Sequence, residues 1–228
     1  MKWIISDPPY RVPDDPERST SMIKGLIGIF GILLLATSGL AQSGPKSWNF
    51  DSETAGKPPS GFTTMAGEWK VVADPTAPSQ PKALAQLAKS SGSTFNLILI
   101  AGTSYKDIDL TVSMKSVAGT EDQGGGLVWR AKDGKNYYVA RYNPLEDNYN
   151  LYKVKNGNRS KLGSATIKSA PGWHALRVTM RGNRIEVYFD RKKVLDAEDA
   201  TFTEPGGIGL WTKSDAQTHF YGLTVGGD

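Results

Sequence analysis

The sequence predicts an all-β protein that folds as an antiparallel sandwich or barrel. Short apolar or alternating stretches recur between residues 48 and 225, and turn-forming residues separate them at near-regular intervals. No stretch keeps a long helical period. The 25 glycines and 13 prolines supply residues for many turns. A series of short strands with regular turn signals is typical of β-sandwiches and β-barrels.

Each predicted strand has a pattern of its own. Ile108–Met114 alternates apolar and polar residues, so one face of that strand is expected to be buried. Phe95–Ile100 is continuously apolar and fits a strand that is buried on both faces. Ala83–Ala88 has helical propensity, but its short length and turn-rich flanks favour a strand. In chain order the predicted strands are Trp48–Asp51, Trp69–Val72, Ala83–Ala88, Phe95–Ile100, Ile108–Met114, Gly125–Arg130, Tyr137–Asn143, Asn150–Val154, Leu176–Met180, Ile185–Phe189, Lys193–Leu195, Gly206–Thr212 and Phe220–Val225.

The meander between residues 124 and 154 is the most informative part of the chain. Asp133-Gly134 is a hairpin turn signal between its first two strands, and Asn143-Pro144 begins the next turn. These strands carry tyrosines, arginines and a tryptophan. Aromatic faces together with planar guanidinium groups suit a surface that binds sugar hydroxyls or carboxylates. The alternative is cross-strand aromatic pairing, with the arginines lying over the sheet.

Five residues form the candidate ligand face. Tyr137 and Arg141 share one side of their strand because they lie four residues apart. Arg130 would stand opposite Tyr137 after a two-residue turn, or opposite Arg141 after a longer loop. Either pairing points both guanidinium groups to one side, and a slip of one residue would exchange the faces. Tyr152 and Trp211 are expected nearby.

The residue inventory excludes several kinds of site. The absence of cysteine excludes disulfides, thiolate catalysis and zinc–thiolate centres. The two histidines, His174 and His219, are too few for a metal centre built on several histidines, and each is expected to pack or to form a surface hydrogen bond. No metal and no cofactor are expected. A divalent metal is compatible with such a fold, but no residue pattern supports one.

Carboxylates decide between binding and catalysis, because glycoside hydrolysis usually needs a pair of them. Asp109 and Glu121 are the weak catalytic candidates. Asp109 is more simply explained as part of a solvated strand face. Glu121, Asp122, Glu146 and Asp147 look like exposed turn residues. The sequence therefore favours binding over cleavage.

The N-terminal part predicts export. Lys24, the apolar run that follows it, and the small residues Gly39 and Ala41 make residues 22–41 a signal peptide that is cleaved after Ala41. The alternative is a retained membrane anchor. Residues 1–21 are a disordered extension or a mis-called start that precedes the true initiator Met22. Residues 42–228 then form a single domain that is secreted or held in the periplasm or cell envelope of a bacterium.

The charge of the chain excludes one class of partner. The net charge is +4, and the longest basic run is Arg191–Lys193. Nucleic-acid binding needs a clustered basic face, so it is not expected. Contact with a membrane is expected only through the export signal.

Several segments carry a resemblance to a known group of proteins. Glu121–Arg130, Asn136–Arg141, Trp173–Arg177 and Gly207–Asp215 resemble the concanavalin A-like jelly-roll proteins. The resemblance is nearest to secreted bacterial domains grouped with 3-keto-disaccharide (3-keto-glycoside) hydrolases and to laminin-G-like domains. It spans roughly Trp48 to Val225. It implies two antiparallel sheets, one of them with a concave face.

The resemblance is specific for the fold and weak for activity, because the superfamily mixes lectins, glycosidases and structural modules. Such domains often carry Phe-Asp-Asp before the last strand, where the acids can serve a structural calcium. This chain has Phe220-Tyr221-Gly222 there, so no ion is expected.

These observations predict a secreted domain that binds a saccharide or glycoside on its concave sheet. A hydrolase acting on (3-keto-)glycosides is the first alternative, and a structural or adhesive envelope protein is the second. The sugar and the oligomeric state stay open.

Overall fold

The computed structural model describes residues 44–79, 81–168 and 170–227, which belong to one compact unit. They form fifteen β-strands in two antiparallel sheets. No helix in these ranges is long and apolar enough to span a membrane. The predicted extension 1–21 and signal peptide 22–41 lie outside the described residues.

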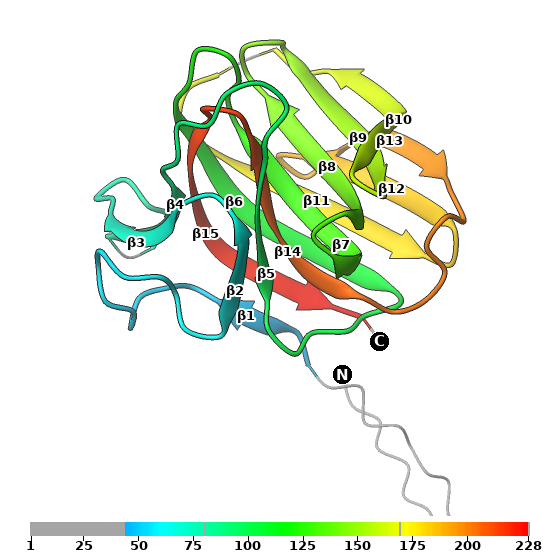
Figure 1. Cartoon of the computed structure of the whole chain (residues 1–228), viewed down its shortest axis with the longest axis horizontal. Helices are drawn as coiled ribbons and strands as arrows, with labels where there is room; N and C mark the ends of the chain where they lie inside the picture. Colours follow the sequence, from blue (N-terminus) through cyan, green and yellow to red (C-terminus); the bar gives the residue numbers. More distant parts are fainter. Residues whose placement is uncertain (1–43, 80, 169, 228) are drawn as a thin grey trace, which may run out of the picture. The chain divides into compact units, whose positions relative to one another are not determined.

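The eight-stranded sheet combines strands from the beginning, the middle and the end of the described chain (Figure 1). Its spatial order is β13 (Lys192–Glu198), β12 (Arg184–Phe189), β11 (Trp173–Arg181), β6 (Ile108–Ala118), β15 (Gln217–Gly226), β4 (Lys82–Gln86) and β3 (Trp69–Ala73), and β1 (Lys46–Trp48) also pairs with β15.

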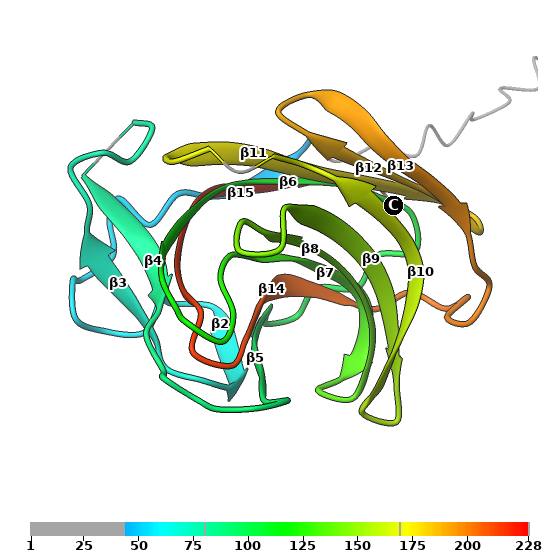
Figure 2. The same ribbon diagram turned by 90° about the horizontal axis from the view of Figure 1, so that it is seen from above.

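The seven-stranded sheet packs against it. Its spatial order is β10 (Asn158–Thr166), β9 (Asn148–Lys155), β8 (Asn136–Asn143), β7 (Gly125–Asp133), β14 (Gly207–Lys213), β5 (Phe95–Ile100) and β2 (Phe62–Ala66). Seen from above, this sheet curls so that its concave face turns away from the eight-stranded sheet (Figure 2). The predicted two-sheet antiparallel sandwich is confirmed.

The main core lies between the two sheets. On β6 the apolar residues Ile108, Leu110 and Val112 are fully buried and alternate with polar residues on the outward face. Trp129 of β7 stacks on Tyr138 of β8, with ring centroids 5.6 Å apart. Burial of one such large side chain stabilises the fold by roughly 1.5–3 kcal/mol.

A second, smaller apolar cluster covers part of the concave face. Its members come from neighbouring strands of the seven-stranded sheet and are almost completely buried: Leu97, Val128, Ala131, Tyr137, Val139, Tyr152, Val154 and Trp211. This is the face on which the sequence predicted a ligand.

All the predicted strands are present, most of them with shifted ends. Phe95–Ile100 matches β5, and the ambiguous Ala83–Ala88 is a strand, β4. The predicted strand Trp48–Asp51 ends earlier, because β1 covers Lys46–Trp48. The strands β2 and β10 were not predicted. They are the two edges of the seven-stranded sheet, and none of their residues is fully buried.

Candidate functional site

Arg130 does not lie on the concave face. The register between β7 and β8 breaks after the pair Trp129 and Tyr138 and resumes at Asp133 and Asn136. Arg130 has a φ of 46°, a left-handed conformation typical of a β-bulge. The bulge interrupts the alternation of side chains, and neither pairing expected for Arg130 is formed.

The guanidinium group of Arg130 is instead bound by loops next to the eight-stranded sheet. It donates hydrogen bonds to the carbonyl oxygens of Lys106, Phe202 and Gly182, each at 2.7 Å. Asp107 Oδ1 lies 3.3 Å from it. The side chain is 1% exposed, and burial lowers the pKa of Arg130. The expectation that Arg130 and Arg141 point to one side is therefore wrong. Arg130 instead links β7 to three loops by hydrogen bonds.

Three other predicted ligand residues do gather on the concave face. The indole Nε1 of Trp211 donates to the hydroxyl of Tyr137 at 3.1 Å. Arg159 of β10 lies over Tyr152, 4.3 Å from its ring centroid. Phe95 packs against Trp211, with ring centroids 5.2 Å apart and planes tilted by 45°. We call Tyr137, Tyr152 and Trp211 the aromatic floor.

The aromatic floor is closed to solvent. Tyr137 and Trp211 are 0% exposed, and Tyr152 is 6% exposed. Burial raises the pKa of Tyr137 to about 12, so its hydroxyl stays protonated at neutral pH. A sugar ring could stack on Trp211 only if Arg159 or Phe95 moved aside.

Arg141 lies on the same face, at the loop end of the sheet. Its guanidinium group pairs with the carboxylate of Asp122, and a second nitrogen lies 3.3 Å from Glu146 Oε2. The other oxygen of Asp122 lies 3.1 Å from Lys213 Nζ, and Asn143 Nδ2 donates to Asp122 at 3.2 Å. We call these five residues the Arg141 cluster. They come from β8, β14, the loop before β7 and the turn after β8.

The Arg141 cluster is buried at its base and open at its top. Asp122 is 1% exposed and Arg141 2% exposed, whereas the side chain of Glu146 is 52% exposed and that of Lys213 is 21% exposed. Each charge at the base has an opposite partner, as buried charges require. A carboxylate and an ammonium group thus face solvent above a fixed ion pair.

Two asparagines extend the cluster along β9. Asn148 Nδ2 donates to Glu146 Oε2 at 2.9 Å, and Asn150 Nδ2 donates to Asn148 Oδ1 at 2.7 Å. Asn150 Oδ1 is buried and has no hydrogen-bond partner among the described residues. Such an acceptor is rare in folded proteins, because leaving it unpaired costs about 1–3 kcal/mol.

The electrostatics of Glu146 favour its ionised form. Burial raises the pKa of Glu146, but the hydrogen bond from Asn148 and the positive charge of Arg141 outweigh it, so the pKa lies below its ordinary value. At neutral pH this carboxylate accepts hydrogen bonds and has no proton to give to a leaving group.

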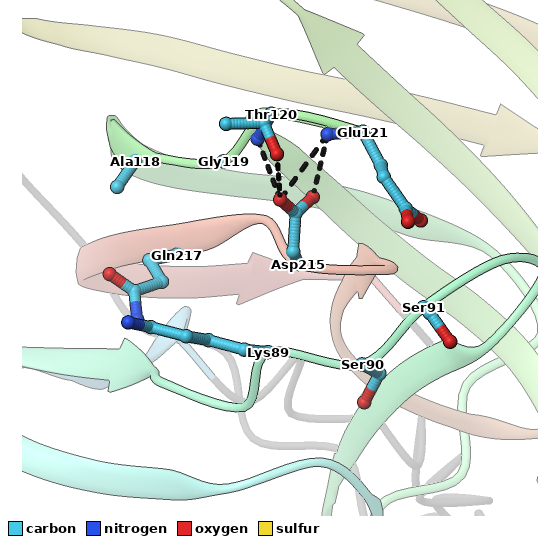
Figure 3. A pocket seen from close by; sticks show the side chains of 9 residues that line it. All are labelled: Lys89, Ser90, Ser91, Ala118, Gly119, Thr120, Glu121, Asp215 and Gln217. Carbon is cyan, nitrogen blue, oxygen red and sulfur yellow. Dashed lines mark hydrogen bonds between the residues drawn. The ribbon is translucent and has the colours of Figure 1, made fainter.

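Asp215, in the turn after β14, fixes the loop that carries Asp122 (Figure 3). Its carboxylate accepts hydrogen bonds from the backbone nitrogens of Thr120 at 2.6 Å and Glu121 at 3.1 Å, which Figure 3 shows. It also accepts one from the backbone nitrogen of Asp122 at 3.0 Å. Gly119 makes this loop possible: its φ is 143°, and a Cβ there would lie 1.9 Å from the carbonyl oxygen of Asp122. The loop is therefore held in one conformation that directs Asp122 to Arg141.

A hollow of 450 Å³ lies beside this loop. In Figure 3, Lys89 and Gln217 lie on one side of Asp215, and Glu121 and Ser91 lie on the other. Glu121 Oε2 accepts a hydrogen bond from the backbone nitrogen of Gly92 at 2.8 Å. Glu121, a weak catalytic candidate, thus ties two loops together.

Asp109, the other weak catalytic candidate, lies at the opposite end of β6 from this loop. It lies on the outward face of β6 and forms a bidentate pair with Arg177, with both N–O distances 2.7 Å. Arg177 in turn lies 4.6 Å from the ring centroid of Tyr188. Asp109 and Glu121 are not brought together, and the pairing of Asp109 matches the solvated strand face expected for it.

The two histidines are held by hydrogen-bonding partners. His174 Nδ1 lies 2.9 Å from Asp190 Oδ2, and its Nε2 lies 2.9 Å from the carbonyl oxygen of Ala170. His219 Nδ1 lies 2.7 Å from Asp74 Oδ2. Within the described ranges, no three histidine or acidic side chains are grouped so that they could hold a metal ion.

The sequence missed part of the Arg141 cluster. Asp122 was expected to be an exposed turn residue, and that expectation is wrong, because it is buried under Arg141 and Lys213. Lys213 could have been found, because it lies two residues after Trp211 on one strand and therefore shares its face. The position of Asp122 depends on Asp215, which lies 93 residues away in the chain and gave no signal.

Comparison with known proteins agrees with this architecture. A family model described as a 3-keto-alpha-glucoside-1,2-lyase-like domain matches residues 48–225. The levanase of Bacillus subtilis (strain 168) is 29% identical over 169 residues, which are 72% of this chain and 22% of the levanase. The chain thus spans about a fifth of the length of that relative.

Solved structures are similar over most of the domain. The carbohydrate-binding module CBM66 from Bacillus subtilis superposes with a TM-score of 0.61 at 25% identity, covering 73% of this chain and 95% of the module. The GH43 protein BlXynB from Bacillus licheniformis, at 12% identity and a TM-score of 0.56, covers 80% of this chain and 39% of that protein, and it supports the fold alone. These matches confirm the resemblance to the concanavalin A-like proteins. By the match over residues 48–225, this chain belongs to the family of 3-keto-alpha-glucoside-1,2-lyase-like domains.

Proposed function

We propose that this protein is a carbohydrate-binding domain that takes a saccharide at the Arg141 cluster, at the loop end of its concave sheet. The observation that carries the proposal is the layered arrangement of the cluster. A buried Asp122–Arg141 pair fixes its base, and the more exposed Glu146 and Lys213 face solvent above it. Asn150 adds a buried acceptor without a partner in the described chain.

This set of groups matches the chemistry of a sugar. Adjacent hydroxyls both donate and accept hydrogen bonds, so they need carboxylate or amide acceptors next to ammonium or guanidinium donors. Bonds to charged groups are the stronger ones, and a rigid base avoids the cost of ordering side chains on binding. The ligand lies at the mouth of the cluster, because the aromatic floor is closed.

The likeness to other proteins supports the same function. The similarity to CBM66 extends over 95% of a carbohydrate-binding module, and the related segment of the levanase belongs to an enzyme named for levan. Levan is therefore the first polysaccharide to test. We also propose that residues 22–41 act as a signal peptide and direct export of the protein, which agrees with a ligand outside the cell.

Hydrolysis of (3-keto-)glycosides is less well supported. A cleaving pair needs one carboxyl group that keeps its proton and one that does not. Glu146 has a lowered pKa, and Asp122 is engaged by Arg141, Lys213 and Asn143. Asp109 and Glu121 take part in other contacts. The family match to a lyase-like domain nevertheless makes turnover a necessary control. The third reading, a structural or adhesive envelope protein, predicts no saccharide ligand.

Binding to a panel of saccharides tests the proposal. The purified full-length chain is titrated with levan, other neutral polysaccharides, glycosides and 3-keto-glycosides, and turnover is followed in parallel. We expect saturable binding without turnover, at least 10-fold weaker in Glu146→Gln and in Lys213→Met. Glu204→Gln is the matched control, because Glu204 is an exposed acid on the loop before β14.

Two results would contradict the proposal. Binding that is equal in the parent, Glu146→Gln and Lys213→Met would place the site elsewhere. Steady conversion of a glycoside would identify the domain as an enzyme.

A further inference from the structure

We propose a second saccharide-binding site on the outward face of the eight-stranded sheet, around Trp173. Trp173 begins β11, and its side chain is half-buried on the face opposite the main core. The site shares no residue with the Arg141 cluster. It does not depend on the function proposed for that cluster.

The Trp173 ring is held in a fixed orientation. Its Nε1 donates to Thr76 Oγ1 at 3.1 Å. Lys115 Nζ donates to the same hydroxyl at 2.7 Å and lies 5.3 Å from the Trp173 ring centroid. Lys115 also pairs with the buried carboxylate of Asp74. A ring fixed in this way loses little freedom when a ligand stacks on it.

A hollow of 520 Å³ opens beside the ring, lined by Trp173 together with Pro78, Ser113, His174, Ala175, Asp190 and Arg191. This volume lies within the range of about 300–1,000 Å³ that is usual for small-molecule sites. The lining combines an aromatic ring with polar groups, whereas the lining of the hollow in Figure 3 contains no aromatic residue.

The β12–β13 turn supplies the polar side of the hollow. Asp190 and Arg191 have positive φ values of 46° and 69°, which set the tight turn between these strands. The Asp190 carboxylate is 50% exposed and is fixed by His174 and by the backbone nitrogen of Ala175. Arg191 is exposed, and its guanidinium group has no hydrogen-bond or ion-pair partner in the described parts of the chain.

These groups select a saccharide. The apolar face of a pyranose or furanose ring can lie on the indole of Trp173. The planar fork of Arg191 binds two acceptors at once, either two adjacent hydroxyls or one carboxylate. Asp190 can accept from a further hydroxyl. Lys115, His174 and Arg191 are the basic groups around the hollow and Asp74 and Asp190 the acidic ones, so a carboxylate-bearing sugar is not repelled.

A site on each sheet would let one domain hold two saccharide chains, or two parts of one chain. Linked sites bind a polymer more tightly than either site alone, because the second contact forms at a high effective concentration. The domain would then cross-link a polysaccharide.

Titration calorimetry of the full-length chain tests this inference. The probes are short oligosaccharides, one set neutral and one set containing uronic acid. We expect two sites per chain. Arg191→Gln and Trp173→Ala each weaken one site at least 10-fold and leave the other. Lys192→Gln is the matched control, because it removes a positive charge next to Arg191 from outside the hollow. A preference for the neutral or the uronic set identifies the group held by Arg191.

The outcomes separate this site from the Arg141 cluster. Loss of one site in Arg191→Gln and of the other in Glu146→Gln supports both proposals. If only the Arg191→Gln and Trp173→Ala variants lose binding, the Trp173 site stands and the Arg141 cluster fails. The inference is overturned if the parent binds neither set, or if Arg191→Gln binds both sets as tightly as the parent does. Arg191 lies on an exposed turn, so its variant tests the site even if Trp173→Ala does not fold.

Discussion

Asp215 shows how one carboxylate can organise a binding loop from a distance in the sequence. Its two oxygens accept hydrogen bonds from three successive backbone nitrogens, those of Thr120, Glu121 and Asp122. Burial raises the pKa of Asp215, but the hydrogen bonds from Thr120 and the following residues outweigh it and lower the pKa from 3.8 to about 2. The folded loop therefore favours the ionised form.

This shift predicts a pH-dependent contribution to stability. A carboxylate whose pKa is lower in the folded state stabilises the fold above its unfolded pKa, and the contribution disappears as the pH falls through the folded value. We expect Asp215→Asn to reduce the free energy of unfolding by about 1 kcal/mol at neutral pH, since water screens the partly exposed carboxylate.

Urea unfolding of parent and variant between pH 7 and pH 2 provides the measurement. The difference between them should be full above pH 3.8 and should shrink as the pH approaches about 2. A difference that does not change with pH would show that the charge of Asp215 is not responsible.

The two arginines of the meander, Arg130 and Arg141, show when the sequence can predict the face on which a side chain lies and when it cannot. Arg141 lies on the predicted face, because β8 keeps the regular alternation from Tyr137 to Asn143. Arg130 leaves that face, because the bulge lets it reach three carbonyl oxygens in distant loops. Local alternation is readable in a sequence, whereas a bulge that depends on remote acceptors is not.

At the scale of the element, β10 closes the concave face. The strand is an edge, and Arg159 reaches from it across Tyr152 towards Phe95, 5.5 Å from the Phe95 ring centroid, and towards Trp211, 5.9 Å from its ring centroid. One nitrogen of this guanidinium group is buried and has no hydrogen-bond partner in the described chain. Cation–π attraction is therefore offset by the cost of an unpaired donor.

Removal of this side chain should open the aromatic floor at little cost. We expect Arg159→Ala to lower the free energy of unfolding by less than about 1 kcal/mol. It should shift the tryptophan emission to longer wavelength and increase quenching by acrylamide, because Trp211 becomes accessible. Lys161→Ala, on the same strand at an exposed position, is the control and should change neither.

The assignment to one tryptophan is checked in the double variant Arg159→Ala with Trp211→Phe. The emission shift should disappear in that background. A shift that persists would mean that another tryptophan responds, and that Arg159 does not cover Trp211 in solution.

The strands that the sequence did not predict explain why this closure was not foreseen. β10 follows the turn Asn156-Gly157, whose φ values are 53° and 81°, so its turn signal was readable. Its residues, however, are mostly polar and exposed, and periodicity identifies only strands with a buried face. β2 contains apolar residues, but it is short and none of its residues is fully buried, so it too lacks a recognisable buried face. Without the two edges, the concave face looked open and its aromatic residues looked available.

At the scale of the whole molecule, the two ends of the described chain meet. β1 pairs with β15 from Lys46 opposite Val225 to Trp48 opposite Leu223. Trp48 also packs against Phe62, with ring centroids 6.5 Å apart. The first strand of the domain thus begins five residues after the predicted cleavage position, Ala41. A processed chain would keep β1 and all of both sheets.

Export is the prediction that belongs to this scale. The basic entry at Lys24, the apolar run and the small residues Gly39 and Ala41 predict cleavage after Ala41, so exported protein should begin at Gln42. N-terminal sequencing of secreted or periplasmic material checks this directly. An intact chain recovered from the membrane fraction would contradict it and would favour the retained anchor.

Truncation separates the signal from the fold. A chain that begins at Gln42 should unfold in urea in one cooperative transition, because the described strands pair within two sheets packed on one core. A chain that begins at Phe50 lacks β1 and Trp48, and it should lose about 1 kcal/mol, less than full burial of a large side chain contributes, because Trp48 is only partly buried. Two separate transitions in the longer chain would contradict a single cooperative domain. Equal stability of both chains would show that residues 42–49 do not complete it.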